Sequence, residues 1–259
     1  MDLNIKNKYA LVTGAGRGLG KGICQTLSNN GVNIIAVSRG IEGLEDLKSN
    51  LDSSMDHHFF LCDLELENSS QDLISQLDFK NLSPDIIVNN AGGNLGFTDP
   101  LKTSEGWRQV MRLNVEAAID INERYIPDMQ EKKWGRICHI SSIAALENQG
   151  PPAYCASKAA LNAYVRSLAR YVSEDNVILT SVMPGAVFTD GGYWDDASVN
   201  RPEHVEKYLN ERMAIKRFGT VDEIAEAVAF LCSDLSGFCV GTCMLIDGGQ
   251  GRVFYPDLT

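Results

Sequence analysis

Short apolar runs alternate with amphipathic segments along most of the chain. The first apolar run ends in a glycine cluster, and the segment that follows it has the spacing of an amphipathic helix. The alternation predicts strands at Lys8–Thr13, Val32–Ser38, His58–Cys62, Asp85–Asn89, Gly135–Ile140, Val177–Val182 and Thr242–Ile246. Helices are predicted between them, at Leu19–Asn29, Ile41–Leu51, Ser69–Leu77, Ser104–Lys132, Ala153–Val172 and Val221–Cys232.

Most of the predicted strands are apolar throughout, which is typical of parallel strands in a sheet with helices on both faces. We therefore expect an α/β fold, a Rossmann-type doubly wound sheet of about seven parallel strands with helices on both faces. No linker, repeat or low-complexity tract divides the chain, so residues 1–259 are interpreted as a single domain. The segment Asp190–Gly219 interrupts the alternation, and we expect it to be a mobile substrate lid at about 190–219.

The charge balance narrows the choice of partners. Lys and Arg total 23 against 34 for Asp and Glu, which gives a net charge of -11. Such a chain lacks a broad electrostatic footprint for nucleic acid or anionic lipid, although a compact anionic cofactor could still bind locally. The N-terminus has no basic region followed by an apolar core, and no apolar run approaches the roughly 20 residues of a membrane span. We expect a cytoplasmic protein that binds neither membrane nor nucleic acid.

The cysteines and histidines do not suggest a metal site. Seven cysteines lie in apolar segments, without a Cys-x-x-Cys pair or a nearby histidine, at positions 24, 62, 138, 155, 232, 239 and 243. We interpret them as reduced core thiols. Among the four histidines, His57 and His58 are adjacent while His139 and His204 are isolated, so no zinc-ligand spacing is present and no metal is expected.

A glycine-rich turn, Thr13–Gly20 (TGAGRGLG), follows the first predicted strand and opens the first predicted helix. This is the context of a dinucleotide-phosphate site, where glycines admit the pyrophosphate and the helix N-terminus offers unpaired N–H groups. The spacing T-G-x-x-x-G-x-G differs from the G-x-G-x-x-G fingerprint, and a simple tight turn is the alternative interpretation.

A second group of residues indicates acid–base chemistry. Tyr154 and Lys158 lie four apart on a predicted helix and share a face, so the cation can lower the pKa of the phenol from its reference value of about 10. Ser142 follows the strand Gly135–Ile140 at its carboxyl end, where open α/β sheets bind ligands. An exposed tyrosine–lysine pair is the alternative interpretation of the first two residues.

Seven motifs occur in one order along the chain. They are TGAGRGLG at Thr13–Gly20, NNAG at Asn89–Gly92, Asn114 within RLNVEAA, Ser141–Ser142, YCASK at Tyr154–Lys158, PGAVFT at Pro184–Thr189 and IDGG at Ile246–Gly249. In their order and approximate spacing the sequence resembles the single-domain branch of the short-chain dehydrogenase/reductase superfamily, over nearly the whole chain.

The resemblance implies roles for four catalytic residues. Tyr154 would be the proton donor to a carbonyl oxygen in reduction, or the base toward an alcohol in oxidation. Lys158 would lower its pKa and hold the nicotinamide ribose, and Ser142, rather than Ser141, would bind the substrate oxygen. Asn114 would hold a water that connects Lys158 to solvent.

The resemblance also implies a set of cofactor-binding residues. It comprises Gly14, Gly16, Arg17, Gly18, Leu19, Gly20, Ser38, Arg39, Asp63, Leu64, Asn90, Ala91, Gly92, Tyr154, Lys158, Pro184, Gly185, Val187 and Thr189. Asn90 and Gly92 would line the ribose, although a tight turn is equally compatible with them. Asp63 would accept a hydrogen bond from the adenine amino group, with a helix N-cap as the alternative role.

The residues after the second predicted strand bear on cofactor choice. An NAD enzyme usually has Asp or Glu there to bind the ribose 2′-OH, whereas this chain has Ser38 followed by Arg39. Arg17 in the glycine turn is a second cation, and guanidinium groups suit phosphate oxygens. NADP(H) is therefore favoured over NAD(H), unless both arginines are plain surface charges.

We therefore expect an NADP(H)-dependent oxidoreductase that interconverts a ketone and a secondary alcohol, with a sugar-pathway intermediate or a 3-oxoacyl compound as candidate substrate. The alternative is a catalytically inactive NADP-binding regulatory or scaffold protein. Candidate substrate-facing residues are Asn94, Ile143, Gln149, Tyr193 and Trp194. The resemblance also implies a homotetramer or homodimer through the long helices Ser104–Lys132 and Ala153–Val172.

Overall fold

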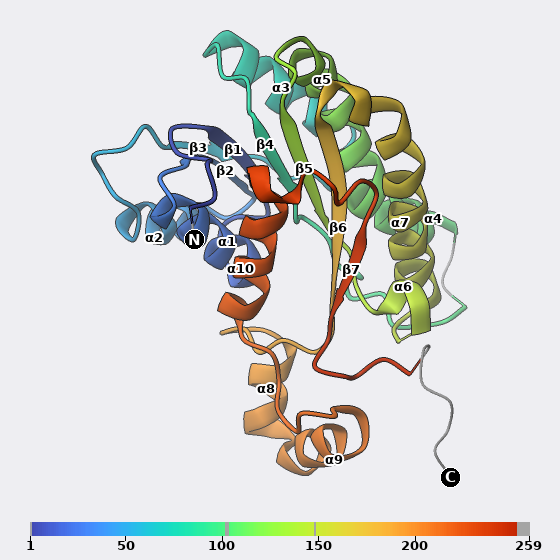
Figure 1. Cartoon of the computed structure of the whole chain (residues 1–259). Helices are drawn as coiled ribbons and strands as arrows, with labels where there is room; N and C mark the ends of the chain where they lie inside the picture. Colours follow the sequence, from blue (N-terminus) through green and yellow to red (C-terminus); the bar gives the residue numbers. More distant parts are fainter. Residues whose placement is uncertain (1, 102–103, 148, 253–259) are drawn as a thin grey trace.

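The computed structural model of the protein describes residues 2–101, 104–147 and 149–252. Its strands form one seven-stranded, entirely parallel sheet in the order β3-β2-β1-β4-β5-β6-β7 (Figure 1). The strands are β1 (Tyr9–Thr13), β2 (Asn33–Ser38), β3 (His58–Leu61), β4 (Ile86–Asn89), β5 (Gly135–Ile140), β6 (Val177–Pro184) and β7 (Cys243–Ile246). The predicted doubly wound α/β fold is confirmed, and each strand overlaps its predicted range.

Helices cover both faces of this sheet (Figure 1). In the described ranges they are α1 (Gly18–Asn29), α2 (Ile41–Ser49), α3 (Ser69–Phe79), α4 (Ser104–Met111), α5 (Ala117–Glu131), α6 (Ala144–Glu147), α7 (Pro152–Val172), α8 (Tyr193–Asn200), α9 (Pro202–Arg212) and α10 (Val221–Leu231). Because successive side chains of a strand point to opposite faces, Val12 of β1 joins the core under α1, α2 and α10, whereas Leu11 joins the core under α3, α5 and α7.

The chain order creates the crevice in which ligands of such sheets bind. The chain leaves β1 toward β2 and β3, then returns so that β4 pairs with the other side of β1. At such a switch point the connections diverge above the carboxyl ends of the two central strands. The glycine turn after β1 and the NNAG segment after β4 therefore lie together.

The predicted helical stretch Ser104–Lys132 is helical from Ser104 to Glu131, although it is not α-helical throughout. A π-helical turn, Arg112–Glu116, separates α4 from α5. Its wider hydrogen-bonding pattern has no hydrophobic signature of its own, so the 3.6-residue period of the flanking segments concealed it. Such π-turns are frequent at functional sites, and this one contains Asn114.

Two further segments contain helices that the sequence analysis did not predict. The segment Asp190–Gly219 contains α8 and α9, which lie beyond the sheet, and α9 contacts Gln250 in the segment that follows β7 (Figure 1). The four-residue α6 lies between β5 and α7. Both α8 and α9 are mostly exposed and polar, so they lack the wide apolar stripe that identifies a core helix.

The side chains of the described residues also bear on the expectations for cysteine, metal and membrane. All seven cysteines are unpaired, and Cys24, Cys138, Cys155 and Cys232 are buried. Within the described ranges, no group of three or more His, Cys, Asp or Glu side chains is placed to hold a metal ion. No helix in those ranges is both long and apolar enough to cross a membrane.

Candidate active site

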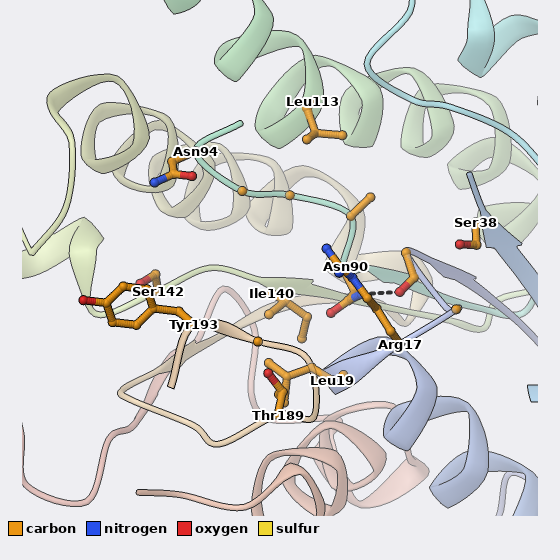
Figure 2. Close-up of a pocket in the computed structure, with 18 of the residues that line it drawn as sticks. Arg17, Leu19, Ser38, Asn90, Asn94, Leu113, Ile140, Ser142, Thr189 and Tyr193 are labelled. Carbon is orange, nitrogen blue, oxygen red and sulfur yellow. Dashed lines mark hydrogen bonds between the residues drawn. The ribbon is translucent and has the colours of Figure 1, made fainter. Parts of the chain in front are cut away.

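A cleft of about 960 Å³ lies at the carboxyl ends of the central strands, with Ser142 and Tyr193 toward one end and Ser38 toward the other (Figure 2). Most of the predicted site residues line it. They are Gly14, Gly16, Arg17, Gly18, Leu19, Gly20, Ser38, Arg39, Asp63, Leu64, Asn90, Ala91, Gly92, Asn94, Ser142, Tyr154, Lys158, Pro184, Gly185, Val187, Thr189, Tyr193 and Trp194.

The glycines of the first turn allow close approach between chain segments. Gly14 has a φ of +65°, and a Cβ at Gly20 would lie 2.1 Å from the Gly14 carbonyl oxygen. A Cβ at Gly16 would lie 2.6 Å from Oγ of Ser38. No side chain caps the N-terminus of α1, and its first residues, Gly18–Gly20, line the cleft. The uncapped helix end therefore favours an anionic group there.

Asn90 fixes this turn to the end of β4. Its Nδ2 donates to the carbonyl oxygens of Thr13 and Gly14 at 2.9 and 3.1 Å, while its own N–H donates to Oγ1 of Thr13 at 3.0 Å. The side-chain amide is thus used to hold the turn, and the side chain still lines the cleft. Its structural role and its predicted place beside a cofactor are compatible.

Lys158 is buried at the catalytic end of the cleft, with 3% of its surface exposed. Its Nζ donates a hydrogen bond of 2.8 Å to the carbonyl oxygen of Ile140, the last residue of β5. Burial disfavours the charged form and lowers the pKa of Lys158 to about 8. The ammonium can therefore lose its proton near neutral pH, which an exposed lysine does not do.

Tyr154 lies on the same face of α7 as Lys158, as the four-residue spacing predicts. Burial raises the pKa of the Tyr154 phenol, and a hydrogen bond with the Ser142 side chain opposes that shift. Nζ of Lys158 lies 5.7 Å from the centre of the Tyr154 ring. The pKa of the Tyr154 phenol was expected to be lowered by Lys158, but in this structure burial of the phenol raises it.

The two serines after β5 have different surroundings. Ser141 is buried, and its hydroxyl donates to the carbonyl oxygen of Lys158 at 3.3 Å. Ser142 is half-buried and interacts with Tyr154, and its Oγ accepts a hydrogen bond of 3.1 Å from the N–H of Ala144. Of the two hydroxyls, that of Ser142 is placed to reach a substrate oxygen beside the phenol.

Asn114 lies behind the cleft rather than in its lining. Nδ2 donates to the carbonyl oxygens of Gly93 and Val110 at 2.8 and 2.9 Å, and Oδ1 accepts from the N–H of Gly93 at 3.0 Å. A Cβ at Gly92 would lie 2.7 Å from Oδ1 of Asn114 and 3.0 Å from Nζ of Lys158. Gly92 therefore lets Asn114 and Lys158 approach each other. Oδ1 keeps a second lone pair for a water.

The other end of the cleft has exposed charges. Arg39 follows Ser38 and forms an ion pair with Glu65, and 58% of the Arg39 side chain is exposed. The Arg17 side chain is also exposed, and no hydrogen bond or ion pair joins it to another residue that the structure describes. Asp63 accepts a hydrogen bond of 3.1 Å from the N–H of Glu65, and Asn68 rather than Asp63 is the N-cap of α3.

The predicted substrate residues separate into two groups. Asn94, Tyr193 and Trp194 line the cleft. Ile143 is buried with 4% exposure and, like Gln149, is not part of the lining. Gln149 is hydrogen-bonded on both sides of its amide, to Glu147 and to Gln250. The expectation that Ile143 and Gln149 line the cleft is therefore not met.

Comparison with known proteins decides the family. A family model described as enoyl-(acyl carrier protein) reductase matches residues 14–250. A 3-oxoacyl-[acyl-carrier-protein] reductase from Haemophilus influenzae is 32% identical over 248 residues, covering 95% of this chain and 98% of the relative. The chain belongs to the short-chain dehydrogenase/reductase superfamily.

Solved structures of other superfamily members have the same fold. L-sorbose reductase from Gluconobacter frateurii, complexed with NADPH and L-sorbose, has a TM-score of 0.87 and 27% identity, covering 96% of this chain and 98% of that one. A 7α-hydroxysteroid dehydrogenase complexed with NADH and 7-oxoglycochenodeoxycholic acid has a TM-score of 0.86 and 29% identity, covering 96% of each chain. These members therefore include proteins complexed with either nicotinamide cofactor.

Several residues that line the cleft were not predicted from the sequence as site residues. Examples are Glu65, Leu113 and Ala186. Leu113 precedes Asn114, so the motif around Asn114 could have identified it. Nothing in the sequence pairs Glu65 with Arg39, which is 26 residues away along the chain. Only the packing of β3 beside β2 brings these two residues together.

Proposed function

We propose that this protein is an NADP(H)-dependent oxidoreductase that interconverts a ketone and a secondary alcohol, with Tyr154 as general acid and base. One observation carries the proposal. Ser142, Tyr154 and Lys158 meet at the end of a cleft whose other part is formed by a glycine turn at an uncapped helix N-terminus. A catalytically inactive regulatory or scaffold protein would need the turn but not these three side chains together.

The glycine turn fits a nicotinamide dinucleotide. Its backbone approaches the cleft at positions where a Cβ would collide with other chain atoms, and the open end of α1 suits a pyrophosphate. Such a cofactor supplies the hydride. Arg17 would hold a 2′-phosphate together with Arg39, and the similarity to the NADPH complex of L-sorbose reductase supports this choice over NAD(H).

In ketone reduction, Tyr154 donates its hydroxyl proton to the substrate oxygen as that oxygen gains charge. Ser142 donates a hydrogen bond to the same oxygen and stabilises the charge. Lys158, when protonated, stabilises the phenolate that remains, and it would also hold the nicotinamide ribose. Asn114 would hold a water through the free lone pair of Oδ1, so that the proton can be replaced from solvent.

The substrate end of the cleft combines aromatic and amide side chains. Trp194 and Tyr193 form part of its wall, and Asn94 lines the same end of the cleft as Tyr193 (Figure 2). A sugar-pathway ketone would use both kinds of group, and a 3-oxoacyl compound is the second candidate, in line with the similarity to 3-oxoacyl reductases. We further propose one catalytic domain with a lid at about 190–219, assembled as a homotetramer or homodimer in the cytosol.

Cofactor binding and turnover test the proposal separately. The purified protein is titrated with NADPH and with NADH, and NADPH consumption is followed with L-sorbose, a 3-oxoacyl thioester and a 7-oxosteroid. We expect tighter binding of NADPH and consumption with at least one ketone, which Ser142→Ala strongly reduces. Binding without turnover of any ketone would favour the inactive alternative, and failure to bind either cofactor would overturn the proposal.

A further inference from the structure

Gln250 has a buried side chain whose amide makes three hydrogen bonds. It lies in the segment after β7, and 2% of its surface is exposed. Its Oε1 accepts from the N–H of Ala186 at 2.7 Å. Its Nε2 donates to Oε1 of Gln149 at 2.7 Å and to the hydroxyl oxygen of Tyr208 at 2.6 Å. Both protons of the amide nitrogen are thus used, and the oxygen is bonded as well.

The three partners belong to three different segments of the chain, and of the three only Ala186 lines the cleft. Ala186 lies in the loop after β6, between the proposed cofactor-binding residues Gly185 and Val187. Tyr208 lies on α9 of the proposed lid. Gln149 precedes Gly150, at which a Cβ would lie 3.3 Å from Cδ1 of the Tyr154 ring. One amide therefore connects the lid, the loop after β6 and the segment that packs against the catalytic tyrosine.

Neighbouring contacts extend this connection. Glu147 accepts hydrogen bonds from Nε2 of Gln149, at 2.8 Å, and from the N–H of Arg252. Nη2 of Arg252 donates to the carbonyl oxygen of Glu211 on α9 at 2.8 Å. In Figure 1 the chain after β7 runs between α9 and α6. The segment 247–252 thus ties the lid to the body of the protein.

The polar side chain of Gln250 indicates that it positions neighbouring segments and does more than fill a gap in the core. Burying an amide costs free energy unless its polar atoms are satisfied, so a leucine of similar size would suit a purely apolar gap better. The Gln250 amide instead forms one hydrogen bond to each of three segments, namely the loop after β6, helix α9 and the segment that contains Gln149. These bonds fix the positions of the three segments relative to one another. Loss of the amide would remove the acceptor to which the N–H of Ala186 donates.

We propose that Gln250 is a positioning residue that holds α8 and α9 closed over the substrate end of the cleft and keeps the loop after β6 aligned with Tyr154. The effect on the lid does not depend on the activity of the protein. Its consequence for catalysis rests on the proposed function. A protein without this amide should open its lid more often, bind substrate more weakly and keep its sheet intact.

Amide hydrogen exchange tests the lid without any substrate. We compare Gln250→Leu and Tyr208→Phe with the native protein, and we use Gln71→Leu, on the exposed surface of α3, as the matched control. We expect the amides of α9 to exchange at least about tenfold faster in both variants, while those of β1 and α1 stay unchanged. Unchanged exchange in α9 would overturn the proposal. Faster exchange throughout the sheet would instead identify Gln250 as a general structural residue.

Steady-state kinetics then distinguish the effect of opening the lid from the effect of displacing the loop after β6. With a ketone that the native protein reduces, Tyr208→Phe should raise KM about fivefold with little change in NADPH affinity, because Tyr208 contacts the amide only from the lid. Gln250→Leu should also lower kcat, because it frees Ala186. The double variant should be no worse than Gln250→Leu alone. Additive effects of the two substitutions would overturn the proposed coupling between Gln250 and Tyr208. If the native protein reduces no ketone, that result counts against the proposed function, and hydrogen exchange alone then decides the role of Gln250 in the lid.

Discussion

The two ends of the cleft differ in burial. At the catalytic end, Lys158 is 3% exposed and its pKa is lowered to about 8, because burial disfavours its charge. At the other end, 58% of the Arg39 side chain is exposed, and its partner Glu65 is also in contact with water. Electrostatic effects are large where water is excluded and small where it is not. The catalytic end should therefore tolerate substitution poorly, whereas substitutions at the exposed end should only adjust affinity.

The largest expected effect is at Tyr154. Tyr154→Phe removes only the hydroxyl, so NADPH binding should survive while ketone reduction falls by roughly 10²–10⁴-fold, the usual loss for a general acid. Steady-state kinetics and NADPH titration measure the two effects. Tyr171→Phe is the matched control, since Tyr171 lies on the same helix and is exposed. Retention of most of the activity by Tyr154→Phe would mean that the acid lies elsewhere in the cleft.

The second prediction concerns a buried histidine in β5, one residue before Ile140, whose carbonyl oxygen accepts the hydrogen bond from Lys158. His139 of β5 is fully buried, with Nε2 close to the side-chain amides of Asn89 and Asn122 at 3.2 and 3.0 Å. Burial lowers the pKa of His139 to about 4, from an ordinary value of 6.5. The unfolded chain therefore takes up this proton first as the pH falls. The stability that neutral His139 provides is present above pH 6.5 and is lost between pH 6.5 and 4.

Denaturant unfolding of the cofactor-free protein between pH 7 and 4 measures this loss. The shift corresponds to about 3 kcal/mol of unfolding free energy, which the His139→Asn variant should not lose over that range. His204→Gln, at an exposed position of α9, is the control. Parallel curves for the native protein and His139→Asn would contradict the assignment and place the acid sensitivity in other groups.

The sequence predicted the fold and the strand-end motifs well, for a physical reason. Parallel strands buried on both faces must be apolar, and ligands must lie at their carboxyl ends, so the positions of Ser142 and Asn90 follow from the strand pattern alone. The spacing of Tyr154 and Lys158 on one helix is equally local. These features depend on residues close together in the chain.

Features that depend on distant contacts could not be predicted in this way. Gln149 was expected to face the substrate, but it is held by Gln250, which is 101 residues away. The pKa of Tyr154 was expected to fall, but burial raises it, and burial is a property of the whole fold. The short exposed helices α8 and α9 lack a strong apolar stripe, because they pack largely through an aromatic cluster around Trp194.

At the exposed end, we expect Arg17→Ala to weaken NADPH binding about tenfold and to leave NADH binding nearly unchanged. An exposed charge-assisted contact of about 1.4 kcal/mol accounts for this factor. Arg39→Ala should have a smaller effect of the same kind, because Arg39 already has Glu65 as a partner. Titrations with both cofactors measure these effects, with the exposed Arg108→Ala on α4 as control. Equal losses for NADPH and NADH would mean that the arginines do not contact the 2′-phosphate.

The smallest expected effect is at Glu65, whose carboxylate lines the cleft and pairs with Arg39. Glu65→Gln removes a charge that competes with a 2′-phosphate for this arginine. Because exposed ion pairs contribute about 0.2–1 kcal/mol, NADPH affinity should rise only about threefold, and NADH affinity should rise less.

Titrations at low and high salt test this explanation, since screening should abolish the gain, and the exposed Glu67→Gln is the matched control. The gain should also disappear in the double variant with Arg39→Ala, because the competition needs both partners. A fall in NADPH affinity in Glu65→Gln would show the opposite relation, in which Glu65 holds Arg39 in place for the phosphate. The exposed end of the cleft would then be preorganised like the buried one, and the contrast between the two ends would be limited to the size of the effects.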